Sequence, residues 1–318
     1  MSLDRLQEAR VRIENAIHRT PLLQSVTLTE LVGAPVHLKC ENLQKTGSFK
    51  VRGALHRLLQ LSEEERARGV STISAGNHAQ AVAWAATAAG VPSLVVMPKH
   101  ASPTKVRASR GYGAEVILHG DAAAAFVRVR ELTAERGLTF VHPFDDEEVI
   151  AGHASCGLEI VEQLPDVGTI VVPVGGGGLS SGIAAAVAAL GAEVDVWGVE
   201  PEGAPAMHRS LDEGRAVHLE SVDTIADGLA APMAGVLNHA LLAAHAKGVV
   251  LVSDDEIVRA MKLLLERTKL LVEPAGAAGM AALLAGRVPF RPGRPVVVVL
   301  SGGNADLVRL ASLFSERT

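Results

Sequence analysis

The sequence is poor in several residue types, and each shortage excludes a class of protein. Only 3% of its 318 residues are aromatic, and the two cysteines, Cys40 and Cys156, are too few for a disulfide framework or a cysteine-based metal cluster. A formal net charge of −5 leaves no basic excess to attract nucleic acid or anionic lipid. The longest apolar runs, such as Val296–Leu300, are too short to span a bilayer, and residues 1–12 lack the apolar core of a signal peptide. We therefore predict a cytoplasmic protein with reduced cysteines and with neither a nucleic-acid nor a membrane partner.

Aliphatic residues dominate what remains. Hydrophobic residues make up 48% of the chain, mostly as Ala, Val and Leu, which typically fill buried parallel strands. Short Val- and Ile-rich runs alternate with amphipathic stretches such as Asp254–Thr268, for which Ser253 is the expected N-cap. The predicted strands are Val36–Lys39, Val70–Ile73, Leu94–Met97, Glu115–Leu118, Thr169–Val174, Val194–Val199, Val249–Val252 and Val296–Leu300. This alternation predicts an α/β fold with parallel sheets, and so many strands favour two α/β lobes over one small sheet.

Four loops at the ends of predicted strands carry unusual residues, and ligands of open α/β sheets bind at such ends. The first, Thr46-Gly47-Ser48-Phe49-Lys50, opens a helix predicted over Val51–Leu61. Ser48 is the expected N-cap, so Lys50 would lie in the first turn, where the helix dipole lowers the pKa of its amine. A Schiff-base lysine needs such a lowered pKa. Taken alone, the segment also fits a surface lysine at the start of a helix.

The second loop, Ser74-Ala75-Gly76-Asn77-His78, follows the strand Val70–Ile73 and opens a helix predicted over Gln80–Ala89. Its small residues let the backbone approach a ligand closely, and the free amides at a helix start suit a carboxylate. Asn77 can donate to a phenolate-type oxygen. An ordinary strand-to-helix turn capped by Ser74 or Asn77 explains the pattern equally well.

The third loop, Gly175-Gly176-Gly177-Gly178-Leu179-Ser180, precedes a helix predicted over Ser181–Leu190. Consecutive glycine amides pointing at one anion, together with the helix dipole, indicate a phosphate site. A dinucleotide is the rival ligand, because Glu200 ends the next strand where a ribose-binding acid would lie. However, the loop contains no G-x-G-x-x-G motif and no Walker lysine, so a single compact phosphate fits better than a pyrophosphate.

The fourth loop, Ser301-Gly302-Gly303-Asn304, directly follows the strand Pro295–Leu300 and precedes a C-terminal helix. The Ser301 hydroxyl can point into a cleft beyond the strand. A plain turn with Asn304 as the N-cap is the alternative, and only the company of the other three loops argues against it.

Together these loops resemble the fold-type II pyridoxal-phosphate (PLP) enzymes, in the branch of threonine dehydratase (threonine deaminase) and serine racemase. The resemblance covers nearly the whole chain. Its motifs, in order, are the Schiff-base segment Gln44–Ala54, the substrate-carboxylate loop Ser74–Gln80, the phosphate loop Pro173–Leu179, Glu273–Ala277 and Ser301–Asn304.

The resemblance implies a role for each site residue. Lys50 would hold PLP as a Schiff base and Ser301 would meet the pyridine nitrogen, and these two are the expected catalytic residues. The cofactor would also contact Phe49 against its ring, Asn77 at the ring hydroxyl, the phosphate-binding residues Gly175, Gly176, Gly177, Gly178 and Leu179, and, facing the site, Gly228 and Glu273. The substrate would bind the loop formed by Ser74, Ala75, Gly76, Asn77 and His78.

The resemblance also implies the architecture and the reaction. Two open, twisted α/β lobes, as in the tryptophan synthase β subunit, would hold the cofactor in their cleft. Residues 1–47 and 147–318 would form the large domain, and residues 48–146 the small one. The expected activity is the conversion of L-threonine to 2-oxobutanoate and ammonia, and of L-serine to pyruvate and ammonia. A homo-oligomer, dimer or tetramer, is expected as well.

Three departures from the family's patterns qualify these expectations. His153 interrupts a Gly-Gln-Gly-Thr pattern and is either a packed interlobe histidine or a pH-sensitive group. Serine racemase binds a divalent metal at positions matching Glu200, Ala204 and Ala206; because Ala206 replaces a carboxylate, we expect no metal site. The chain ends at Thr318 without the regulatory domain of biosynthetic threonine dehydratases, so we expect no feedback inhibition by isoleucine.

Ala75 separates the dehydratase from its nearest rival. Serine racemase has a serine at the matching position, which serves as its second acid, and a methyl group has no proton to give. The remaining alternatives are a serine racemase or a β-replacement enzyme of the same fold and, from another class, a nicotinamide-dependent oxidoreductase or a nucleotide-binding protein. A PLP enzyme would absorb visible light through its lysine aldimine, and borohydride would reduce that aldimine to a permanent bond; a protein of the latter class would show neither.

Overall fold

The computed structural model describes residues 1–316, and its strands form two separate sheets. The larger sheet has six strands in the order β1-β2-β10-β7-β8-β9. These strands are β1 (Leu22–Gln24), β2 (Val36–Lys39), β7 (Thr169–Pro173), β8 (Asp195–Pro201), β9 (Gly248–Val252) and β10 (Val296–Val299). β1 runs antiparallel to β2, and every other neighbouring pair is parallel.

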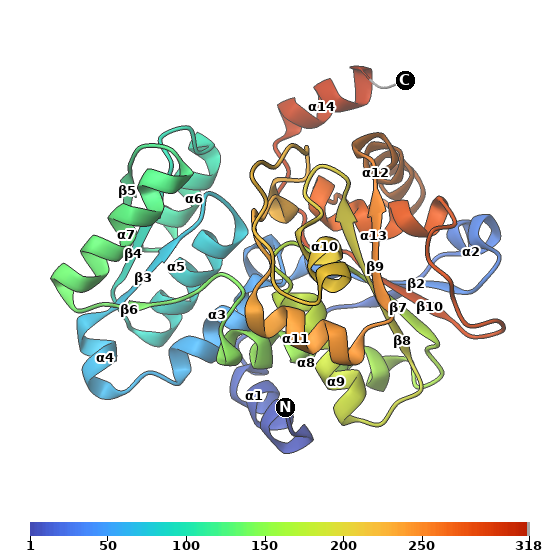
Figure 1. The fold of residues 1–318 in the computed structure, drawn as a ribbon, viewed down its shortest axis with the longest axis horizontal. Coiled ribbons are helices and arrows are strands. Elements are labelled where there is room, and N and C mark those ends of the chain that lie inside the picture. Colours follow the sequence, from blue (N-terminus) through green and yellow to red (C-terminus); the bar gives the residue numbers. More distant parts are fainter. Residues whose placement is uncertain (317–318) are drawn as a thin grey trace.

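The smaller sheet is parallel throughout and has the order β5-β4-β3-β6. Its strands are β3 (Val70–Ile73), β4 (Ser93–Met97), β5 (Glu115–Leu118) and β6 (Thr139–Phe140). Figure 1 shows this sheet beside the larger one, with α5 (Asn77–Ala89), α6 (Pro103–Gly111) and α7 (Ala122–Arg136) around it and α3 (Lys50–Leu59) between the two sheets.

Of the remaining helices, α4 (Glu63–Arg68) lies in the smaller part between α3 and β3, and the others pack with the larger part. These others are α1 (Leu3–Ile13), α2 (Val26–Val32), α8 (Glu147–Gln163), α9 (Gly178–Ala189), α10 (Ala206–Glu213), α11 (Val236–His245), α12 (Asp254–Thr268), α13 (Pro274–Leu284) and α14 (Leu307–Glu316), with the short 3₁₀ turns η1 (Glu41–Leu43), η2 (Lys45–Gly47) and η3 (Asp227–Leu229). Among residues 1–316 we find no helix with the length and apolarity that a bilayer crossing requires.

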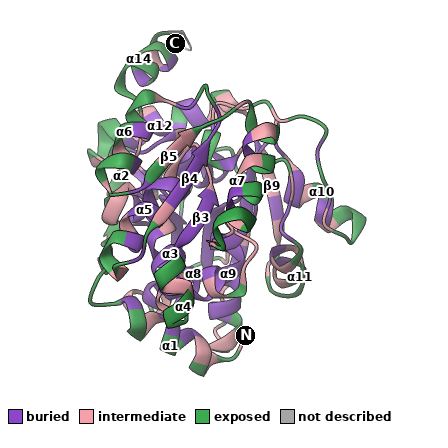
Figure 2. Cartoon of the chain, turned by 90° about the vertical axis from the view of Figure 1, so that its left-hand side faces the viewer, coloured by how far each residue is buried: buried purple, intermediate pink, exposed green. Residues whose placement is uncertain are grey.

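The core of the larger part lies on both faces of β7 and β10, whose residues are all buried. Successive side chains of a strand point to opposite faces. Val298 therefore packs in the cluster that contains Met280 of α13, whereas Val297 packs in the cluster that contains Ile183 of α9. Figure 2 shows the resulting pattern of buried strands between helices whose outer faces are exposed.

All eight predicted strands are present, with ends shifted by at most two residues. Helix α12 has the predicted limits, and Ser253 caps it in a reciprocal pair with Glu256. The sequence interpretation missed β1 and β6, since each is only two or three residues long and β1 is a mostly exposed edge strand. The smaller sheet lies wholly within residues 48–146. The division of the chain into residues 1–47 with 147–318 and residues 48–146 remains a proposal.

Candidate active site

Lys50 is the first residue of α3, and its Nζ donates a hydrogen bond to the Pro143 carbonyl oxygen at 2.7 Å. Burial lowers the pKa of Lys50 to about 8. The direction agrees with the prediction, but the cause is lost solvation rather than the helix dipole. The predicted N-cap is wrong: Phe49 precedes the helix without a capping bond, and the buried Ser48 hydroxyl has no partner among the described residues.

Histidines that are neutral at physiological pH lie near Lys50. Burial, and to a lesser degree the positive charge of Lys50, lowers the pKa of His78 and His153 well below the usual value. The Nδ1 atom of His153 accepts a hydrogen bond from the Gly53 amide at 3.2 Å. The rings of His153 and Phe49 contact each other edge-on, with their centroids 4.8 Å apart. Of the two interpretations of His153, the structure therefore favours a packed histidine. His153 lies on α8 and packs against the Phe49 ring.

The glycine loop presents unused donors at the start of α9. No backbone hydrogen bond of the described residues has its donor among the amides of Gly175, Gly176, Gly177, Gly178 and Leu179. Gly177 is the cap residue at φ +103°, in the left-handed region, which favours glycine. A Cβ on Gly176 would overlap the ring of Phe144, so glycine is required there as well. Unpaired amides at a helix N-terminus form an anion site.

Ser301 lies beside the segment that carries Lys50. The Phe49 amide donates to the Ser301 carbonyl oxygen at 3.1 Å, and Ser48 forms an isolated antiparallel bridge with Gly302. Ser301 is buried, and its hydroxyl makes no hydrogen bond within the described part of the chain. The first and fourth loops of the sequence interpretation are therefore adjacent.

Asn77 connects the smaller part of the fold to the larger one. Its Nδ2 donates to Glu273 Oε1 at 2.5 Å, and its Oδ1 accepts from Asn304 Nδ2 at 2.9 Å. Burial raises the pKa of Glu273 to about 7. Asn304 also donates to the Thr46 carbonyl oxygen at 2.7 Å. The alternative role of Asn304 as a helix N-cap is wrong, because the Asp306 carboxylate accepts from the first-turn amides of α14 instead.

The loop Ser74–His78 lies at the start of α5, which begins at Asn77 rather than at the predicted Gln80. The Gly76 amide donates to Ser74 Oγ at 3.1 Å, so Ser74 closes the turn. No backbone hydrogen bond within residues 1–316 has the amide of Asn77 or His78 as its donor. These two amides are available to a carboxylate, and Ala75, half-buried, lies next to them.

Gly228, in η3, lies between two other parts of the site. Its carbonyl oxygen is 3.1 Å from where a Cβ of Gly175 would lie, and a Cβ on Gly228 would be 3.9 Å from Glu273 Oε1. The structure therefore brings together all the site residues expected from the sequence. It adds Pro143 and Phe144, whose loop gave no recognisable pattern.

Glu200 has a structural task at the end of β8. Its two oxygens accept the amides of Met207 and His208, each at 2.8 Å, and so cap α10. Burial raises its pKa to about 8. No cluster of three or more His, Cys, Asp or Glu side chains with metal-binding geometry occurs within residues 1–316.

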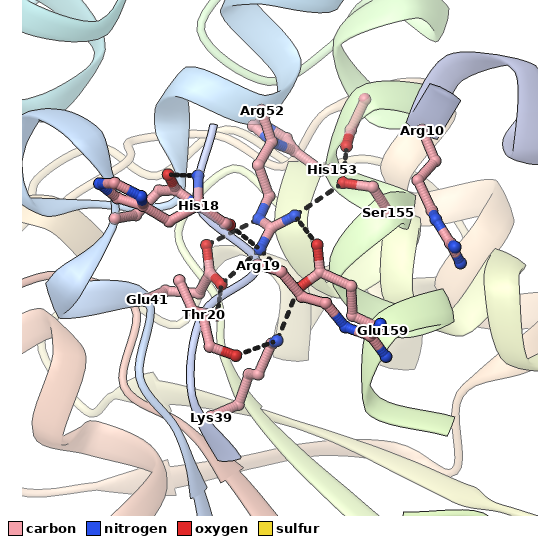
Figure 3. Close-up of polar contacts among 12 residues, drawn as sticks. Arg10, His18, Arg19, Thr20, Lys39, Glu41, Arg52, His153, Ser155 and Glu159 are labelled. Atoms are coloured by element: carbon pink, nitrogen blue, oxygen red, sulfur yellow. Dashed lines mark hydrogen bonds and ion pairs between the residues drawn. The ribbon is translucent and has the colours of Figure 1, made fainter. Parts of the chain in front are cut away.

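A buried ion network surrounds Arg52 of α3, two residues after Lys50 in the chain (Figure 3). The Arg52 guanidinium binds both carboxylate oxygens of Glu41, each at 2.8 Å, and both of Glu159, at 2.7 and 2.9 Å. Lys39 Nζ also binds Glu159, at 2.6 Å. Two cations and two anions balance each other, as a buried ionic cluster requires. The network ties η1, α8 and β2 to the helix that begins with Lys50.

A family model described as "Pyridoxal-phosphate dependent enzyme" matches residues 13–302. The chain belongs to this family.

Relatives within the family are similar over nearly all of this chain. The L-threonine ammonia-lyase of Thermotoga maritima is 47% identical over 311 residues, which cover 96% of this chain and 76% of that protein. The structure of a T.th. threonine deaminase superposes with a TM-score of 0.90 at 44% identity, covering 96% of this chain and 99% of that one. Maize serine racemase has a TM-score of 0.94 at 36% identity, covering 99% and 97%.

The residues described above fit the PLP on which the family depends. Five amides without a backbone acceptor can donate hydrogen bonds to the cofactor's phosphate, and a half-buried lysine with a lowered pKa can form a Schiff base with its aldehyde. The Ser301 hydroxyl has no partner among residues 1–316 and is free to bind the pyridine nitrogen. The fold is the two-lobed α/β fold of type II, and the chain is a PLP-dependent lyase. A nicotinamide oxidoreductase and a non-catalytic nucleotide-binding protein are thereby excluded.

Proposed function

We propose that the protein is a threonine and serine dehydratase. It converts L-threonine to 2-oxobutanoate and ammonia, and L-serine to pyruvate and ammonia. The observation that carries the proposal is the meeting of Lys50, the free amides of the glycine loop and the free amides of Asn77 and His78 in one site. The names of the Thermotoga maritima ammonia-lyase and the T.th. threonine deaminase support the same activity.

Each group around the cofactor has a proposed task. The amides of Gly175–Leu179 would hold the phosphate, and Phe49, supported by His153, would pack against the ring. Asn77 would donate toward the ring hydroxyl, and Glu273 and Asn304 fix the direction of its amide. Gly228, beside Glu273, would face the ring. The Ser301 hydroxyl would meet the pyridine nitrogen and would not keep it protonated as a carboxylate does.

The reaction then needs a base and a carboxylate anchor. When bound, PLP withdraws electrons from the substrate's Cα. The Lys50 amine, whose pKa of about 8 leaves a useful unprotonated fraction near neutral pH, takes the Cα proton. The amides of Asn77 and His78 and the Ser74 hydroxyl hold the carboxylate, and Ala75 and Gly76 keep that loop close to the substrate. The Cα proton and the β-hydroxyl are lost as water, and the remaining enamine tautomerises to an imine, which a second water hydrolyses to the keto acid and ammonia.

Ala75 argues for elimination rather than racemisation. Inversion at Cα needs a second group to deliver a proton to the face opposite Lys50. The methyl group of Ala75 has no proton to deliver, so we infer that D-serine is at most a trace product even though serine racemases are among the structural relatives.

A keto-acid assay tests the proposed function. Purified enzyme with PLP should form 2-oxobutanoate from L-threonine and pyruvate from L-serine, with one ammonia per keto acid. Chiral chromatography of the L-serine reaction should show pyruvate in large excess over D-serine. D-serine formed as fast as pyruvate would identify a racemase instead.

Two properties of the whole protein remain part of the proposal. We infer a cytoplasmic enzyme that assembles as a homo-oligomer, dimer or tetramer. Light scattering behind a size-exclusion column would give the mass of the assembly, and a mass of about 33 kDa would contradict it.

A further inference from the structure

A cavity of about 490 Å³ opens beside the site, between α6, η3 and α14. Gly228, Glu273 and Asn304 of the active site form part of its wall, and Lys105, Asp227 and Arg309 supply charged side chains. The cavity therefore reaches Glu273 and Gly228 of the active site, and a substrate entering here passes those charges.

Lys105 belongs to α6 in the smaller part of the fold and faces this cavity. Its side chain is 21% exposed, and its Nζ lies 3.6 Å from Asp227 Oδ2 in the larger part. The same Nζ is 3.9 Å from where a Cβ of Gly76 would lie, so it is next to the carboxylate loop. Its charge also reaches Glu273, on which it acts electrostatically. The ammonium group thus lies between the loop, Glu273 and Asp227.

Asp227 does not depend on Lys105 for compensation. Arg309 of α14 binds the same Asp227 oxygen at 2.8 Å and also donates to the Ile225 carbonyl oxygen. The longer 3.6 Å pair with Lys105 is the weaker of the two. Asp306, another acid of the wall, accepts backbone amides of α14. Asp227 is an exposed side chain, and it keeps Arg309 as its partner when Lys105 binds another group.

We propose that Lys105 binds the α-carboxylate of the incoming amino acid, exchanging Asp227 for it, and holds that carboxylate against the amides of Asn77 and His78. The inference rests on the proposed function, since it assumes an amino-acid substrate. The groups assigned above to the carboxylate are all neutral. Of the two cations that residues 1–316 place in the cavity wall, Arg309 is bound to Asp227 and Ile225, whereas Lys105 lies beside Gly76. An anion entering such a wall needs a cation, and charge-assisted hydrogen bonds are about twice as strong as neutral ones.

The test is steady-state kinetics of the PLP-loaded enzyme with Lys105→Met. Loss of one ammonium–carboxylate contact should raise KM for L-threonine about tenfold, while kcat changes less than about twofold, because the contact is made equally before and during the reaction. Added salt should raise KM of the wild type more than that of the variant. Lys105→Arg keeps the charge and should restore KM to within about threefold of the wild type.

Arg107→Met is the matched control. Arg107 is an exposed cation of the same helix whose guanidinium binds Thr104, and its loss should leave KM, kcat and the salt response unchanged. An unchanged KM in Lys105→Met, an equal KM rise in Arg107→Met, or a loss of kcat at constant KM would each overturn the proposal.

A binding measurement separates this inference from the proposed reaction. L-alanine has the carboxylate and amine but no β-hydroxyl, and its binding, followed by the visible absorbance of the PLP-loaded enzyme, is the measurement. Lys105→Met should weaken that binding about tenfold. If the wild type makes no keto acid but this difference remains, the proposed reaction is wrong and the role of Lys105 stands. Equal L-alanine affinities of wild type and variant contradict the role of Lys105.

Discussion

Arg52→Met should cost this protein a large part of its stability. The Arg52 side chain is 0% exposed and forms four hydrogen bonds to carboxylate oxygens of Glu41 and Glu159, plus one to Ser155. Methionine fills a similar volume but leaves two buried carboxylates with Lys39 as their one remaining cation in the network. Removing one partner from a buried ionic cluster costs about 3–5 kcal/mol, against a total stability of about 5–15 kcal/mol for a typical protein.

The size of the loss should depend on the net charge left behind. Arg52→Met with Glu41→Gln removes one charge of each sign and leaves the Lys39–Glu159 pair, so the double variant should be more stable than Arg52→Met alone.

The pH dependence of the stability loss provides a second control. Burial raises the pKa of Glu41, but Arg52 more than offsets this, and the pKa lies below the usual value. Without Arg52, burial acts unopposed and the pKa rises. A carboxylic acid with a raised pKa is stabilising below that pKa, so the loss should shrink as the pH falls.

Urea unfolding followed by far-UV circular dichroism, at pH 7 and pH 5, measures these differences. The reasoning predicts the order wild type, double variant, Arg52→Met at pH 7, with a smaller gap at pH 5. Arg52→Met within about 1 kcal/mol of the wild type at pH 7 would refute the account of the network, since an exposed ion pair contributes that little. A double variant less stable than Arg52→Met would refute the charge-balance argument.

The other predictions concern the site. Ser301→Asp should retain PLP but lower kcat about tenfold or more, because a carboxylate keeps the pyridine nitrogen protonated; stopped keto-acid assays and the absorbance spectrum check this, and an unchanged rate and spectrum contradict it. Ala75→Ser should raise the ratio of D-serine to pyruvate from L-serine in chiral chromatography, whereas an unaltered ratio would show that the opposite face is closed. Glu273→Gln should flatten the pH dependence of stability. A buried acid with its pKa raised from 4.5 to about 7 makes the wild type less stable as the pH rises through that window, and parallel curves for both proteins would mean that Glu273 titrates normally.

Much of the site could be predicted because each loop follows a buried strand and opens a helix. Runs such as Val296–Leu300 are buried on both faces, so their hydrophobicity marks them as strands. The next residues then lie at the carboxyl end of the strand, where the structure has Ser301 and the glycine loop. The unused amides of Gly175–Leu179 are likewise a local consequence of a glycine-rich helix start.

Contacts between distant segments could not be predicted in this way. Asn304 has the sequence position of an N-cap, but its partners are Asn77 and Thr46, more than two hundred residues away. Ser48 is a good cap residue by type, yet its bridge to Gly302 holds its backbone away from the capping position. In the sequence, Arg52 and Lys105 resemble surface cations of amphipathic helices. The partners of Arg52 become apparent only when α3 packs on α8, and the partner of Lys105 only when α6 lies opposite η3.

The most direct test of the central claim is to locate the lysine that holds the cofactor. The PLP-loaded enzyme is reduced with borohydride, digested with a protease, and its peptides are identified by mass spectrometry. The account predicts a pyridoxyl group on Lys50, in the peptide that contains Gly47-Ser48-Phe49, and no such modification in Lys50→Ala. A pyridoxyl group on Lys105 or another lysine, or none in the wild type, would contradict it.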